Sequence, residues 1–304
     1  MTTPPTPPAT PPAEAATSNI YDLGYRRYEG ERLGRRDAVL ALYRESLRGA
    51  FGLGRSAASK VAPAILIGIA LVPALVQLII AAVIPIEAEL IRAEDYYGLI
   101  TLVLALFCGV VAPDIVGRDQ RNRSLTLYFS RAISRTDYAL GKLATMTTAM
   151  LAITLAPQVL LFVGNALGTQ DFGRFVADEW TQVFPIVGTA AIGSALIASI
   201  GVVVAAQTPQ RAFATVGIIV AFVLPLFIAS ILVQEIGTEV LRPAVFISPL
   251  DLLDGTTVWL FGGTLEDSVA TEAGFHPATY LAGCLVITAV AIGLLLRRYA
   301  KVQA

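Results

Sequence analysis

Residues 61–86 read VAPAILIGIALVPALVQLIIAAVIPI, a run of 26 residues without a charged side chain. The hydrocarbon core of a bilayer is about 30 Å thick, and about 20 consecutive apolar residues cross it as a helix. Five more runs are long enough to cross it: residues 98–116, 143–168, 180–206, 212–234 and 279–296. Asp114 is the one charged residue in all six runs, as expected where burying a charge in lipid is costly. The sequence therefore predicts an all-α integral membrane protein with six transmembrane helices.

The composition and the placement of basic residues predict the same class and an orientation. The chain of 304 residues is 55% hydrophobic and 15% charged, which leaves too little polar surface for a soluble protein. Nineteen of its 22 Lys and Arg residues lie before residue 61, within 118–142, at 211 or after 296. Such an excess marks the cytoplasmic side, so both termini are predicted to be cytoplasmic. The opposite connections hold fourteen of the 23 acidic residues, which either solvate outer loops or form a cation-attracting vestibule.

The segments outside the apolar runs differ in character. Residues 1–20 are rich in proline and are predicted to form a disordered cytoplasmic tail, and residues 297–304 form a second tail. Residues 21–60 contain a predicted amphipathic helix lying in the cytoplasmic interface, followed by the transmembrane domain, residues 61–296. The apolar side of this helix is predicted to comprise Val39, Leu40, Tyr43, Leu47, Ala50 and Phe51. The long outer loop, residues 235–278, is apolar but interrupted, which favours a re-entrant or surface-lying element before the last span.

Small residues and cysteines indicate how the helices pack. Ala190, Ser194 and Ala198 repeat at four-residue spacing in the fourth run, a pattern typical of closely paired membrane helices. The spacing leaves open whether the pairing is within the chain or between subunits. The two cysteines, Cys108 and Cys284, lie in predicted spans and are interpreted as packing residues rather than a disulfide or metal ligands.

The most informative polar stretch is DIVGRDQRNRSLTLYFSRAISRTDYALGKLAT, residues 114–145. Ser134 and Asp137 fit a capping box, so the third membrane helix is predicted to begin near Arg135. The preceding residues 125–129 form a short apolar patch flanked by arginines. Charge and composition alone favour contact with lipid headgroups.

The pieces 124–130, 131–135 and 138–142 of this stretch resemble the segment between the second and third spans of ABC-transporter type-2 exporter permeases. Ser124 and Leu127 stand where that family has a glycine and a glutamate, whereas AISRTDYALGK, residues 132–142, is close. The resemblance implies a coupling loop, residues 117–142, that docks on a cytoplasmic ATPase, with two permease subunits and two ATPases in the working unit of a bacterial plasma membrane. The positions implied at or near the ATPase contact are Arg118, Arg121, Arg123, Arg131, Arg135 and Asp137, with Arg44 and Arg48 as a second contact.

The chain has no nucleotide-binding motif of its own. A P-loop needs G-x-x-x-x-G-K-[ST], and the one Gly-Lys pair, Gly141 and Lys142, is followed by Leu143 and has Thr136 at the place of the first glycine. ATP and magnesium are therefore expected in a partner subunit, and the chain is predicted to be neither an enzyme nor a binder of metals, cofactors or nucleic acid. The predicted partners are the ATPase, a second identical or paralogous permease subunit, and the lipid bilayer.

The sequence supports two alternative functions less well. An ion-coupled secondary transporter would place ionisable groups near the midplane, where the runs instead hold the uncharged candidates for a pathway, Gln77, Gln158, Phe162 and Asn165. An intramembrane serine protease would pair a serine of the fourth run with a histidine. Ser194 lacks the full motif, and His276, the single histidine, lies at the predicted outer mouth.

Overall fold

The chain is built of helices throughout its described part. The computed structural model describes residues 30, 34–54, 57–83, 92–130, 133–169, 172–263 and 268–301, and within these ranges no strand occurs. The predicted proline-rich tail and Arg131 lie outside the described residues. The elements are α1 (Arg35–Ala50), α2 (Ala57–Val83), α3 (Ala93–Ala112), η1 (Pro113–Gly117), α4 (Arg118–Arg121), α5 (Leu125–Phe129), α6 (Arg135–Gly168), α7 (Phe172–Glu179), η2 (Trp180–Gln182), α8 (Val183–Gln207), α9 (Arg211–Ser230), η3 (Ile231–Glu235), η4 (Glu239–Ile247), α10 (Pro249–Phe261), α11 (Val269–Ala273) and α12 (Pro277–Ala300).

Among the described residues, six helical segments are long and apolar enough to cross a membrane, and each contains or overlaps one predicted run. They are Ser59–Ile80, Asp95–Arg121, Arg135–Leu167, Gly173–Gln207, Arg211–Glu235 and Pro277–Ala300. The prediction of an all-α protein with six apolar spans is therefore confirmed, and the chain is a multi-pass membrane protein. The fourth segment begins earlier than predicted because α7 and η2 lead into α8.

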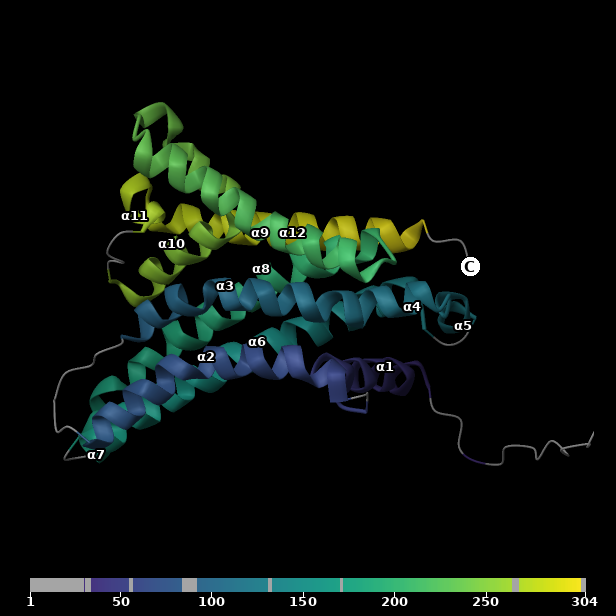
Figure 1. Cartoon of the computed structure of the whole chain (residues 1–304), viewed down its shortest axis with the longest axis horizontal. Helices are drawn as coiled ribbons and strands as arrows, with labels where there is room; N and C mark the ends of the chain where they lie inside the picture. The colour runs from purple at the N-terminus through teal and green to yellow at the C-terminus, as the bar shows by residue number, and fades with distance from the viewer. Residues whose placement is uncertain are drawn as a thin grey trace, which may run out of the picture. The chain divides into compact units, whose positions relative to one another are not determined.

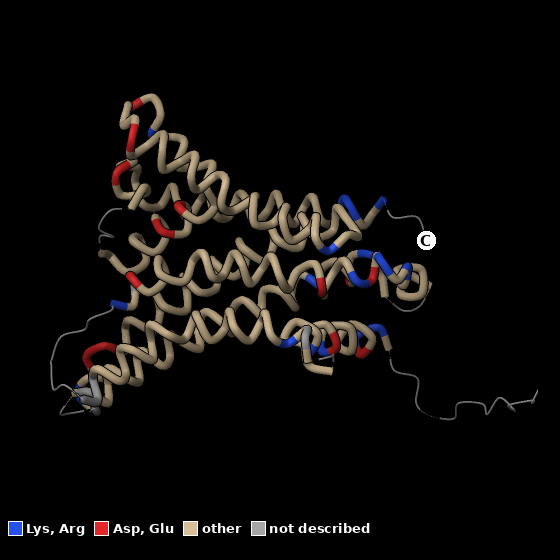
Figure 2. The backbone as a smooth tube through the Cα atoms, in the orientation of Figure 1, with Lys and Arg blue, Asp and Glu red and all other residues tan. Residues whose placement is uncertain are grey.

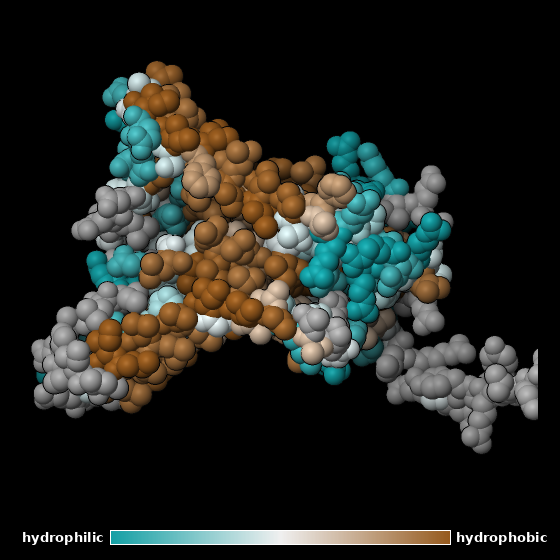
Figure 3. Space-filling view, viewed as in Figure 1, coloured by the Kyte–Doolittle hydropathy of each residue, from teal (hydrophilic) through white to brown (hydrophobic). Residues whose placement is uncertain are grey.

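The spans lie side by side, and charge separates their two ends (Figures 1 and 2). Basic residues of α1, α4 and the last turn of α12 gather at one end, here named the basic end. Acidic residues of α7, α10 and α11 lie at the opposite, acidic end. Between them runs a belt of apolar side chains (Figure 3). This arrangement gathers the basic segments of the sequence at one end of the helices, and the side of the membrane that this end faces stays a prediction.

The core is formed around α3 and α8, whose span residues are the most buried, whereas only 22% of those in the α2, α9 and α12 spans are buried. The small residues Ala190, Ser194 and Ala198 are all buried inside the chain, so this part of α8 pairs with helices of its own chain. The closest approach is at Gly201, where an added Cβ would lie 2.0 Å from Cys108 Sγ. Both Cys108 and Cys284 are free and buried, as predicted for packing residues.

The long outer connection folds into a bent pair of helices. η4 and α10 meet at an angle of 98°. Ser248 caps α10 by accepting a hydrogen bond from the Asp251 backbone N–H, and Pro249 occupies the first turn, where its missing N–H is harmless. α10 packs against α8 and α12, and most of its residues are buried. Entry of this pair into the bilayer stays a prediction.

Candidate functional site

The second span ends in an irregular segment at the basic end. Pro113 cannot donate a backbone hydrogen bond, and the chain widens there into the π-turn η1 before α4 continues the helix. Asp114, the one charged residue of the predicted runs, lies in this turn. Its carboxylate Oδ1 is 3.4 Å from Nε of Arg211 at the start of α9. A counter-charge from a neighbouring helix thus accompanies the buried carboxylate.

The turn between α4 and α5 is closed by an arginine in a conformation that favours glycine. Arg123 has φ 52°, in the left-handed region. Its N–H donates to Gln120 O, and the N–H of Ser124 donates to Asp119 O, which together form a Schellman motif with Arg123 at the usual glycine position. The arginine side chain is exposed. The backbone therefore bears strain at one of the predicted contact residues.

The short helix α5 projects an apolar side chain into solvent. None of its described residues, 125–129, is buried, and Leu127 is 67% exposed. The opposite side of α5 is held by aromatic contacts, with the rings of Tyr128 and Phe129 centred 5.6 Å and 5.8 Å from that of Tyr138. Burial and the charge of Asp119 raise the pKa of the Tyr128 hydroxyl, which therefore stays protonated at neutral pH. α5 is thus held against Tyr138 by its aromatic side chains and exposes Leu127 on its other side.

Beneath α5 lies a buried polar cluster formed by Ser46, Asp119, Tyr138 and Lys142, here named the Asp119 cluster. Lys142 Nζ lies 2.8 Å from Asp119 Oδ2 and donates to Ser46 Oγ at 2.9 Å. The Tyr138 hydroxyl donates to the same Asp119 oxygen at 2.8 Å. The side chains of Lys142 and Asp119 are 5% and 13% exposed. Because a buried charge without partners is costly, these contacts fix the relative positions of α1, α4 and α6.

Sequence reasoning missed this cluster, although it did single out Lys142. Tyr138 and Lys142 are four residues apart on α6 and therefore share a face, which the spacing could have shown. Ser46 and Asp119 lie 96 and 23 residues before Lys142, and nothing local marks them as its partners. The network forms through tertiary packing alone.

α1 packs along the first turns of α6, and its buried face differs from the predicted one. Leu42, Ser46 and Ala50 are buried, whereas Leu40, predicted on the apolar side, is 46% exposed. The packing is close at Gly141, where an added Cβ would lie 3.4 Å from Leu42 Cδ2. The predicted face is reproduced in part: Ala50 is buried, and Leu47 and Phe51 pack against the core. Ser46, which was not predicted on this face, lies opposite the ammonium of Lys142.

The predicted capping box at the start of α6 is present. Ser134 Oγ accepts from the Asp137 N–H at 3.1 Å, and Asp137 Oδ2 accepts from the Ser134 N–H at 3.0 Å. Arg35 of α1 also donates to both carboxylate oxygens of Asp137, each at 2.7 Å. These bonds raise the pKa of the Arg35 guanidinium. Asp137 therefore joins α1 to α6, and its contact with an ATPase stays a prediction.

The remaining predicted contact residues are exposed at the basic end. This holds for Arg44 and Arg48 on α1, Arg118 and Arg121 on α4, Arg123 in the turn, and Arg135 on α6. Arg135 lies over the Phe129 ring, 5.9 Å from its centroid, and donates to Ala300 O at 3.4 Å. The end of the last span thereby meets α5 and the start of α6. The structure brings these cations to one surface without joining them into one ion-pair network.

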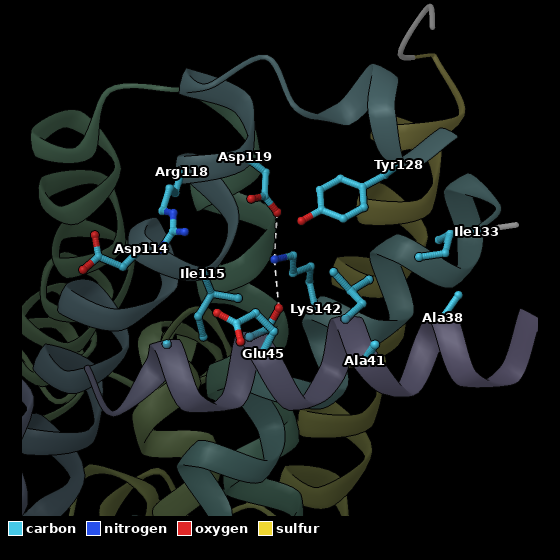
Figure 4. Close-up of a pocket in the computed structure, with 13 residues that line it drawn as sticks. Ala38, Ala41, Glu45, Asp114, Ile115, Arg118, Asp119, Tyr128, Ile133 and Lys142 are labelled. Atoms are coloured by element: carbon cyan, nitrogen blue, oxygen red, sulfur yellow. Dashed lines mark hydrogen bonds and ion pairs between the residues drawn. The ribbon is translucent and has the colours of Figure 1, made fainter. Parts of the chain in front are cut away.

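A pocket of about 480 Å³ opens between α1, η1, α4 and the start of α6 (Figure 4). Its walls mix small apolar side chains with charges. The lining residues are Ala38, Ala41, Leu42, Glu45, Ser46, Gly49, Asp114, Ile115, Arg118, Asp119, Tyr128, Ile133 and Lys142. The Asp119 cluster forms one wall, so the pocket adjoins the region where the predicted contact residues lie.

The four pathway candidates lie on two helices, Gln77 on α2 and the other three, Gln158, Phe162 and Asn165, in the second half of α6. Gln77 Nε2 donates to Asn165 Oδ1 at 3.2 Å, and Gln158 Nε2 donates to Ala93 O at 3.0 Å. Gln158, Phe162 and Asn165 line a cavity of only about 10 Å³. That volume holds about one water molecule. The described residues thus leave no room for a cargo at this place.

The residues of the protease hypothesis are not brought into a catalytic pair. Ser194 is 2% exposed, and within the described chain its hydroxyl has no hydrogen-bond partner. His276 caps α12, where its Nδ1 accepts from the Ala278 N–H.

No family model matches the chain, and no curated protein matches it.

Proposed function

We propose that this chain is the membrane permease subunit of an ATP-driven, ABC-type exporter. Its basic end, formed by α1, α4, α5 and the start of α6, is then the docking surface for a separate ATPase subunit that binds ATP and Mg²⁺. The protein resides in a bacterial plasma membrane with both termini in the cytoplasm. The positive-inside distribution of Lys and Arg and the resemblance of residues 124–142 support this assignment.

The observation that carries the proposal is that α5 is held in place by aromatic contacts while Leu127 stays exposed. An exposed leucine among exposed arginines offers a partner one apolar contact surrounded by positive charge. Leu127 is 67% exposed and follows the exposed Arg121 and Arg123, while the neighbouring Tyr128 packs on the ring of Tyr138. Tyr138 in turn donates to Asp119, which binds Lys142. A push on α5 therefore reaches α1 and α6 through direct contacts.

The cavity near Gln158 supports the presence of a second permease subunit. About 10 Å³ cannot accommodate a cargo, so a passage requires another wall or a rearrangement of the helices. Apolar faces of α2, α9 and α12 are exposed and available for lipid or for that subunit. An identical or paralogous subunit, and alternating access driven by closure of two ATPases, complete the proposed unit. The low charge of the spans favours a lipophilic or amphipathic cargo.

The test is co-purification of a tagged chain from native membranes, with Mg²⁺-dependent ATP hydrolysis as the readout. The unaltered chain should retain an ATPase, and Leu127→Asp should release most of it by placing a charge in the apolar contact. Val240→Asp is the control, because Val240 is 87% exposed in η4 near the acidic end. Retention of ATPase activity by Leu127→Asp, or cargo movement by the purified chain alone, would contradict the proposal.

A further inference from the structure

The pocket at the basic end owes its existence to a stripe of small residues on α1. Ala38, Ala41, Ser46 and Gly49 face it at helical spacing, where larger side chains would fill the space against η1 and α4. The resulting volume of about 480 Å³ lies within the range of small-molecule sites, about 300–1,000 Å³. Ile115 and Ile133 add apolar walls from the other elements. The pocket is therefore preformed and amphipathic.

Some of the charges that line this pocket are paired and others are not. Lys142 and Asp119 pair with one another in one wall, and Asp114 pairs with Arg211. Arg118 and Glu45 come from different elements, and in the described part of the chain neither forms an ion pair. Figure 4 shows both side chains at the pocket, Arg118 from α4 and Glu45 from α1. A single cation or anion would satisfy one of these groups and leave the other uncompensated.

We propose that the pocket binds a phosphoethanolamine group, a phosphate ester carrying a primary ammonium. The Arg118 guanidinium presents a planar set of donors suited to phosphate oxygens. The Glu45 carboxylate accepts hydrogen bonds from an ammonium, which a quaternary choline cannot donate. The Tyr128 hydroxyl, which also lines the pocket, offers a further donor to the phosphate. The small residues of α1 accept the carbon skeleton between the two charges.

The level of the pocket favours a phospholipid as the source of this group. Arg118 follows directly after a predicted apolar run that ends at residue 116, and Lys142 directly precedes the run that begins at residue 143. Both therefore stand where hydrocarbon gives way to headgroups. Val61 and Ile65 in the first turns of α2, which packs against α6, are more than half exposed and offer apolar surface for acyl chains. The inference does not rest on the proposed function, since it concerns the chain without an ATPase.

The test is native mass spectrometry of the purified chain in detergent, titrated with phosphatidylethanolamine, phosphatidylglycerol or phosphatidylcholine of the same acyl chains. We expect phosphatidylethanolamine to bind at least about tenfold more tightly than the other two, because loss of one charge-assisted contact costs about 1.4 kcal/mol or more. Competition by glycerophosphoethanolamine, which has no acyl chains, distinguishes the sources. Equal competition indicates a soluble ligand, and weak competition indicates the lipid.

Two neutral variants have different expected effects, which separates the roles of the charges. Arg118→Gln should weaken phosphatidylethanolamine and phosphatidylglycerol alike, because both carry the phosphate. Glu45→Gln should weaken phosphatidylethanolamine alone and remove the preference between the two lipids. Arg36→Gln and Asp37→Asn are matched controls, because both residues are exposed on α1 and do not line the pocket. Both controls should leave binding unchanged.

A third variant tests the pocket itself without altering its charge. Ala41 is on the exposed side of the pocket wall, so Ala41→Phe fills the space with little effect on the core, and it should abolish the preferential binding. Circular dichroism and gel filtration verify that each variant is folded. Equal binding of the three lipids to the unaltered chain, or a preference that survives Glu45→Gln or Ala41→Phe, would overturn the proposal. Loss of ATPase association in Ala41→Phe without any lipid preference would instead identify the pocket as a protein contact.

Discussion

Neutralising one member of the Asp119 cluster should be far more damaging than neutralising both charged members. Asp119→Asn removes the carboxylate that lies 2.8 Å from the Lys142 ammonium, whose side chain is 5% exposed. Breaking a buried ion pair by removing one partner costs about 3–5 kcal/mol. Since the Asp119 side chain is 13% exposed, we expect the lower part of this range, about 3 kcal/mol of unfolding free energy. Lys142→Met should cost a similar amount, because Asp119 keeps only the Tyr138 hydroxyl as a strong partner.

The double variant Asp119→Asn with Lys142→Met removes both charges and fills the space of the lysine stem. Its cost should be lower than that of either single variant, so it should fall short of their sum by more than about 3 kcal/mol. Unfolding by SDS titration in mixed micelles, followed by circular dichroism, measures all three. Asp178→Asn is the control, since its ion pair with Arg174 spans 3.8 Å between side chains that are 68% and 81% exposed. Single variants that cost under about 1 kcal/mol and combine additively would refute a buried pair.

Two further predictions concern the backbone and the core. Arg123→Gly should raise the unfolding free energy by about 1 kcal/mol in the same titration, because glycine adopts φ 52° without strain, and Arg123→Ala should give no such gain. A loss of stability in Arg123→Gly would show that its side chain makes a stabilising contact. Gly201→Ala should cost about 1–3 kcal/mol, because its Cβ meets Cys108 Sγ at 2.0 Å. Adding Cys108→Ala should recover part of that cost, and a double variant no more stable than Gly201→Ala would contradict the packing argument.

The spans were predictable because lipid imposes a simple requirement on every residue of a crossing helix. Length and the absence of charge located all six, and the small residues of α8 correctly marked a close helix contact. The capping box of Ser134 and Asp137 also followed from the sequence, since both of its hydrogen bonds join residues three apart. Local sequence patterns were thus sufficient to predict the membrane helices and the start of α6.

The site was only partly predictable because its interactions join distant parts of the chain. The arginines of residues 118–135 were recognised by their density, whereas Asp119 among them gave no sign that it would be the buried one. On α1 the apolar residues predicted a face lying in the membrane interface, but the spacing did not show that Ser46 would be buried as a partner of Lys142. The pocket beside the Asp119 cluster arises from small residues of α1, and small residues give no chemical signal in a sequence.

The π-turn at Pro113–Gly117 determines how far the residues of α4 are rotated about the helix axis. Each residue of a helix turns the chain by about 100°, so deleting one residue between Asp114 and Asp119 would swing Asp119 by roughly that angle, away from Lys142. Substitutions in this segment alter single contacts, but a change of length would misalign α4, the strained turn and α5 together. The segment Pro113–Gly117 should therefore be more sensitive to insertions and deletions than to single substitutions.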